Sequence, residues 1–123
     1  MTGPDPLADR VLAAERSAHD QLTAALSGAP LCRVDGTGTR SAKHWEGRSA
    51  AMAEVRRDLT RAARAEAGTD EQAIIRRRLA EWQERAATST LMSGPAWTAY
   101  LQGGISALTE LVDEEPAPIV EHR

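Results

Sequence analysis

The side chains best suited to metal chemistry in this chain are three histidines and one cysteine. His19, His44, His122 and Cys32 are scattered over 123 residues, without the Glu-x-x-His or Cys-x-x-Cys spacing that gathers metal ligands. Glu15 and His19 stand four residues apart and could share a ligand, but an ordinary side-chain pair across one helical turn is the better explanation. We therefore expect no metal and no other cofactor.

Catalysis by a nucleophile or by an acid and base is no better indicated. Cys32 would need a base and an orienting acid beside it, and nothing in the sequence brings a histidine to it. Glu15 and Glu81 occupy corresponding places in two similar halves of the chain and could form a general acid and base pair. Solvated or arginine-paired carboxylates are the simpler interpretation, so an enzyme with an acid site in a bundle core is only an alternative.

Arginine is the remaining candidate for chemistry. The formal net charge is −3, yet residues 33–85 hold 12 basic and 9 acidic side chains. Seven arginines flank a predicted turn at Gly68-Thr69, namely Arg56, Arg57, Arg61, Arg64, Arg76, Arg77 and Arg78. They predict a basic end that could bind nucleic-acid phosphates. A solvated face balanced by nearby acidic residues is favoured instead, because the chain is acidic overall and lacks a recognition motif.

The elements that position these residues are helices, and a repeated segment is their clearest sign. The segment that starts at His44 returns 56 positions later with its large apolar, Glu/Gln, Gly, Ala, Met/Leu, Glu and aliphatic residues in register. Gly47 and Ala51 are four residues apart, as are Gly103 and Ala107. A helical glycine costs roughly 0.5–1 kcal/mol relative to alanine. We therefore expect these four residues to form small-residue strips where helices approach closely.

Periodic apolar residues predict four helices. We expect them to begin at Pro6, after a cap at Ser41, after a capping box from Thr69 to Gln72, and at Pro95. The chain has no Phe and one Tyr, so we expect Trp45, Trp82 and Trp97 to dominate the packing of the core. Trp45, as part of the repeated segment, is expected to point into the core.

The predicted fold is all-α and resembles a four-helix bundle, with two tandem helical hairpins related by an internal duplication. Residues 1–115 form a single helical domain in this prediction, and residues 116–123 form a flexible acidic tail. No apolar run approaches the ~20 residues that span a membrane, and the N-terminus lacks a secretion signal. The lone cysteine fits a reducing compartment, so we expect a cytoplasmic protein without membrane contact.

Two charged side chains point into apolar helix faces. Arg48 lies in the apolar arc of the second predicted helix, and Glu15 lies in that of the first. An unpaired buried guanidinium is very costly. We therefore expect Arg48 to be at least half buried and bonded to a carboxylate, with Glu15 as the leading partner or else a group on another chain.

These patterns favour a non-enzymatic small helical assembly or adaptor protein that acts through protein–protein contacts as a homo-oligomer. Catalytic spacing is missing, while apolar faces are broad for so short a chain. The alanine-rich, arginine-rich composition suggests a high-GC genome, and the repeated Gly-x-x-x-Ala helices resemble small helical proteins carried by phages or mobile elements. The alternatives are a nucleic-acid-associated regulator that uses the arginine-rich end and the enzyme described above.

Overall fold

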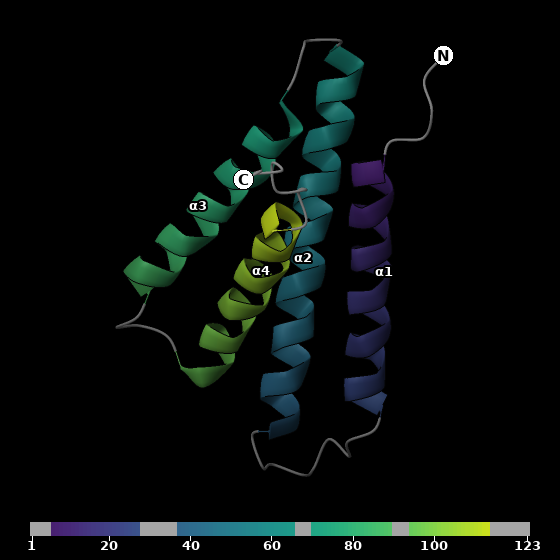
Figure 1. The fold of residues 1–123 in the computed structure, drawn as a ribbon. Coiled ribbons are helices and arrows are strands. Elements are labelled where there is room, and N and C mark those ends of the chain that lie inside the picture. The colour runs from purple at the N-terminus through teal and green to yellow at the C-terminus, as the bar shows by residue number, and fades with distance from the viewer. Residues whose placement is uncertain (1–5, 28–36, 66–69, 90–93, 114–123) are drawn as a thin grey trace, which may run out of the picture.

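The computed structural model describes residues 6–27, 37–65, 70–89 and 94–113, and each of these ranges contains one helix. The helices are α1 (Pro6–Ser27), α2 (Thr37–Ala65), α3 (Glu71–Ser89) and α4 (Pro95–Asp113), as Figure 1 shows. The predicted all-α fold with bundle-like packing is confirmed. The predicted domain boundary between residues 115 and 116 lies outside the described residues.

Proline marks the start of two helices as expected. Pro6 is the first residue of α1, and Pro95 is the first residue of α4. Proline suits this position because its missing N–H would have no partner inside the helix and its φ is already helical.

The starts of the other two helices differ from the prediction. α2 begins at Thr37, one turn before the expected cap at Ser41, since an established helix gains a further turn at little cost despite glycine and threonine. Asp70 caps α3: its Oδ1 accepts hydrogen bonds from the backbone N–H groups of Gln72 at 3.0 Å and Ala73 at 3.3 Å. The expected cap, Thr69, lies outside the described residues.

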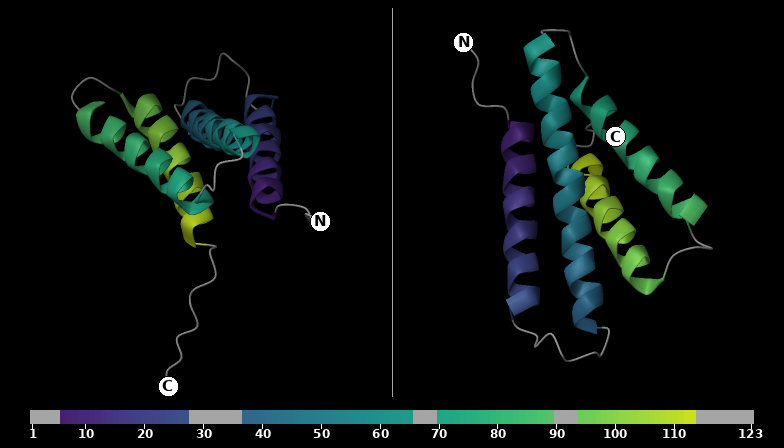
Figure 2. Two further views of the ribbon diagram at one scale, coloured as in Figure 1. Left: turned by 90° about the horizontal axis from the view of Figure 1, so that it is seen from above. Right: turned by 180° about the vertical axis from the view of Figure 1, so that it is seen from behind.

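Helix α2 is the centre of the bundle. α1 packs antiparallel against one side of α2, and α4 packs against another side in the same direction as α2 (Figures 1 and 2). α3 runs antiparallel to α4 and contacts both α4 and α2. α1 packs chiefly on α2, whereas α3 divides its contacts between α4 and α2.

The apolar core lies where α2 meets the other three helices. The largest fully buried side chains are Trp82, Met52, Ile75, Leu108, Val11 and Val55. The expectation that Trp45 points into the core is wrong, because Trp45 is only partly buried and does not belong to the core cluster. Its ring instead packs edge-on against His44, with centroids 5.3 Å apart. Its direction on α2 turns it away from α4.

None of the four described helices combines the length and hydrophobicity that a membrane-spanning helix needs.

Candidate functional site

The backbones of α2 and α4 touch at two glycines. A Cβ atom on Gly47 would lie 2.8 Å from the carbonyl carbon of Tyr100 and closer still to its oxygen. A Cβ atom on Gly103 would meet the carbonyl of His44 in the same way, again at 2.8 Å from the carbon. Each glycine therefore faces the residue three positions before the other glycine. The contact is reciprocal and leaves no room for a side chain.

The alanines of the two predicted strips are buried as well. Ala51 is 0% exposed and Ala107 is 3% exposed, and both belong to the core cluster. All four strip residues thus serve the packing of this bundle. Any contact between copies of the chain must use other surfaces.

Arg48 is paired across the contact between α2 and α4. Its side chain is only 16% exposed, and its Nη2 and Nη1 donate to the two carboxylate oxygens of Glu110 at 2.6 and 3.2 Å. The guanidinium also lies 5.6 Å from the ring centroid of Trp45. The expected partner Glu15 is wrong, since Glu15 accepts two hydrogen bonds from Arg56 at 2.6 and 3.1 Å. The antiparallel register of α1 and α2 sets Glu15 about two turns beyond Arg48.

A second carboxylate is bound at the equivalent place on α2. Glu54 precedes Glu110 by the same 56 residues that separate the repeated segments. Its carboxylate accepts a hydrogen bond of 2.9 Å from the indole N–H of Trp82. The Trp82 ring can reach it because Gly104 has no side chain where the ring packs against α4. Sequence reasoning missed Gly104, although the adjacent pair Gly103-Gly104 was a signal for an unusually close contact.

The strongest charge cluster joins α2 to α3. The Asp58 side chain is 4% exposed and accepts hydrogen bonds from Arg78 Nε at 2.6 Å and Nη2 at 3.1 Å. Arg61 adds a third bond to Asp58 at 3.3 Å, while Glu81 accepts from Arg78 at 3.1 Å. Hydrogen bonding to Arg78 holds the pKa of Asp58 below its ordinary value, although burial acts in the opposite direction. The cluster therefore stabilises the α2–α3 contact.

The predicted basic end is balanced in part by acidic groups. Of the seven predicted arginines, Arg56, Arg61 and Arg78 bond to carboxylates, and Arg57, Arg64, Arg76 and Arg77 are exposed.

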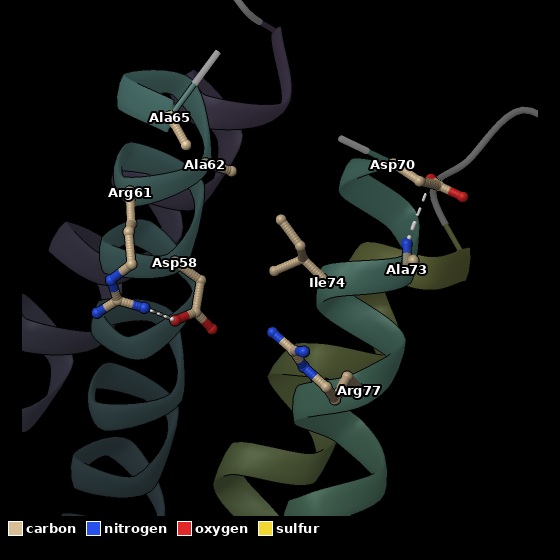
Figure 3. Close-up of a pocket in the computed structure, with 8 residues that line it drawn as sticks. All are labelled: Asp58, Arg61, Ala62, Ala65, Asp70, Ala73, Ile74 and Arg77. Carbon is tan, nitrogen blue, oxygen red and sulfur yellow. Dashed lines mark hydrogen bonds and ion pairs between the residues drawn. The ribbon is translucent and has the colours of Figure 1, made fainter. Parts of the chain in front are cut away.

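A pocket of about 560 Å³ lies at this end of the bundle, between α2 and α3 (Figure 3). Its walls are formed by Asp58, Arg61, Ala62, Ala65, Asp70, Ala73, Ile74 and Arg77. Two guanidinium and two carboxylate groups share these walls. Because the charges are mixed, the pocket has no evident selectivity for a phosphate group.

The histidines and acidic residues considered for catalysis do not form one site. Burial, and then the charge of Arg48, lower the pKa of His44 below its ordinary value. Glu15 and Glu81 lie on α1 and α3 and bind different arginines. Among the described residues, no three His, Cys, Asp or Glu side chains are placed to hold a metal ion. Cys32 and His122 lie outside the described residues.

Three large apolar side chains remain at the surface of the described helices. Leu12 is 36% exposed and Leu26 is 55% exposed, both on α1. Trp97 on α4 is 36% exposed, but its ring stacks on Tyr100 at 5.2 Å and lies beneath the guanidinium of Arg85. Within the described ranges, no aromatic ring or guanidinium covers either leucine in this way, and sequence reasoning did not single them out.

The fold and these contacts define a small all-α helical bundle in which ion pairs join α1, α3 and α4 to the central helix α2. Comparisons with protein-family models, with curated proteins and with solved structures gave no match.

Proposed function

We propose that this chain is a non-enzymatic assembly or adaptor protein that acts through protein–protein contacts and associates with itself. The observation that carries the proposal is the exposure of Leu12 and Leu26 on α1. Removing apolar surface from water is favourable by roughly 25 cal/mol per Å². A second protein surface over α1 would supply that burial.

Other features of the bundle support a contact role over a catalytic one. Glu15 and Glu81, the candidate acid and base pair, are each bonded to an arginine: Glu15 to Arg56 on the neighbouring helix α2, and Glu81 to Arg78 on its own helix α3. Both carboxylates are therefore engaged in ion pairs, and that of Glu15 joins α1 to α2. The glycines of the small-residue strips are buried in the contact between α2 and α4 and are not available to a partner. The exposed apolar side chains of α1 are left as the most distinctive surface.

Sedimentation equilibrium of a double variant, Leu12→Glu with Leu26→Glu, tests the proposal. The wild type should show a mass that rises with concentration above the 13.2 kDa of one chain, whereas the variant should remain at one chain mass. The matched control is Ala73→Glu with Ala87→Glu, which adds the same charge at the same 14-residue spacing on exposed positions of α3. A control variant that also loses association would show that charge alone is responsible, and a wild type that never exceeds one chain mass would refute self-association.

The nucleic-acid alternative has weaker support. Its best observation is the exposure of Arg57, Arg64 and Arg77 near the α2–α3 turn. Duplex binding that weakens steeply with salt, and that is lost in a variant with these three residues changed to Glu, would favour this alternative over ours.

We also propose that the two hairpins arose by duplication. The exchange of equivalent contacts between Gly47 and Gly103 supports this proposal, as do the matched carboxylates Glu54 and Glu110. An experimental structure in which a rotation near two-fold fails to superpose α1 and α2 on α3 and α4 would refute it. We also propose a cytoplasmic location, which the single cysteine supports, and a phage-like origin, which the repeated Gly-x-x-x-Ala helices support.

A further inference from the structure

Three of the exposed side chains of α1 follow a seven-residue spacing. Leu12, His19 and Leu26 are each seven residues apart, and all three are exposed. Seven residues turn an α-helix by nearly two full turns, so the three side chains lie in one stripe. This stripe spans about 21 Å along the helix axis. It borders Glu15 and Leu22, which are partly buried.

The stripe is symmetric about its middle residue. His19 has one exposed leucine at equal distance before it and after it. We infer that two copies of the chain pair through this stripe in antiparallel orientation, with His19 at the two-fold axis. Leu12 then packs against Leu26 of the partner subunit, and the same contact recurs by symmetry. This inference rests on the proposed function, since it names the surface and the partner of self-association.

The charges beside the stripe select the antiparallel orientation. Arg16 and Asp20 are exposed on one flank of the stripe, and neither has a hydrogen bond or ion pair within the described part of the chain. In an antiparallel pair centred on His19, Arg16 is offset from Asp20 of the partner subunit by about 3 Å along the axis. Two symmetric ion pairs follow. In a parallel pair in register, this flank would face the opposite flank of the partner subunit, so these two ion pairs would not form.

The neighbouring ion pair is left intact by this arrangement. Glu15 points to the opposite flank of the stripe, where Arg56 of the same chain holds it at 2.6 Å. Its charge is therefore neutralised next to the leucines. A stripe of about four turns and two ion pairs makes a small interface, so we expect weak association in the micromolar range.

Disulfide trapping distinguishes the two orientations. In a Cys32→Ser background, His19→Cys should form a covalent dimer rapidly under mild oxidation, because residues at the axis approach closely enough for a disulfide. Leu12→Cys alone should not, but a mixture of Leu12→Cys chains with Leu26→Cys chains should form a mixed dimer. Gln83→Cys, on an exposed position of α3, is the control for random collision. Rapid dimer formation by Leu12→Cys alone would mean a parallel pair and would overturn the inference.

Charge reversal supplies a second test that leaves the apolar stripe unchanged. Arg16→Asp should raise the dissociation constant of the dimer about tenfold, and so should Asp20→Arg, because each replaces two attractions by two repulsions. The double variant should restore association. If the wild type associates but neither the trapping nor the reversal has the stated effect, this interface is wrong while self-association stands. If the wild type does not associate at all, the proposed function itself fails.

Discussion

Gly47→Ala should destabilise the protein, although alanine is the better helix former. The added Cβ would lie 2.8 Å from the carbonyl carbon of Tyr100, well inside the 3.4–4 Å of ordinary contact. The obstacle is backbone, which cannot turn aside as a side chain can. α2 and α4 must therefore separate by roughly 1 Å, which forfeits about a quarter to a half of the dispersion energy along their contact.

The magnitude follows from two opposing effects. Overpacking a well-packed contact costs typically ~1–3 kcal/mol, while replacing a helical glycine by alanine gains about 0.5–1 kcal/mol. The net loss of unfolding free energy should be about 0.5–2 kcal/mol. Each kcal/mol lowers the melting temperature by roughly 3–6 °C for a chain of this size. Gly103→Ala should behave alike, because its Cβ meets His44 in the same way.

Urea and thermal unfolding followed by circular dichroism measure the effect. Gly94→Ala is the control, since no atom lies within 4 Å of its added Cβ, and it should change the melting temperature little. The variant with both Gly47 and Gly103 replaced should lose less than the two single losses together, because one separation of the helices relieves both clashes. Single variants that melt at or above the wild-type temperature would refute the close contact between the backbones.

Three further predictions concern the side-chain contacts. Asp58→Asn should lower the unfolding free energy by about 1–3 kcal/mol at pH 7. Because the folded pKa of Asp58 is lowered, this stabilisation is present above its unfolded pKa near 3.9 and is lost as pH falls through the folded value. Urea unfolding should therefore show a smaller difference in stability between the wild type and the variant at pH 3 than at pH 7. The folded pKa of His44 is also lowered, so the wild type should lose stability as pH falls below about 6.5, and His44→Gln should lose less. Plots of unfolding free energy against pH that run parallel for the wild type and the variant would contradict this. Gly104→Ala should displace the Trp82 ring, since its Cβ would lie 2.7 Å from Cη2, and should shift the tryptophan emission to longer wavelength; an unchanged spectrum would mean that the ring is not held there.

The close contact made by α2 and α4 could be predicted from the sequence, because the signal for it is the type and spacing of a few residues. A glycine lowers the stability of a helix, and two helices with glycines at the same offset therefore indicate a place where backbones approach closely. The burial of Ala51 and Ala107 follows from their position one turn later. The starts of α1 and α4 could also be predicted, since Pro6 and Pro95 are local signals for the first residue of a helix.

The ion pairs could not be predicted in the same way. The partner of Arg48 depends on which helix lies beside α2 and in what register, and neither is written in the local sequence. Glu110 reaches Arg48 because α4 runs alongside α2 in the same direction. The exposure of Leu12 and Leu26 could not be predicted for a related reason. Helical periodicity gives an apolar arc, but the covered part of that arc depends on how many neighbours the helix has.

The central claim is that the chain associates with itself through α1. Methyl NMR spectra of the full chain over a series of micromolar concentrations test it most directly. The signals of Leu12 and Leu26 should shift together with concentration, while those of Ile105 on α4 should stay in place. Spectra that do not change with concentration, or changes that gather on α3 and α4 instead, would contradict the claim.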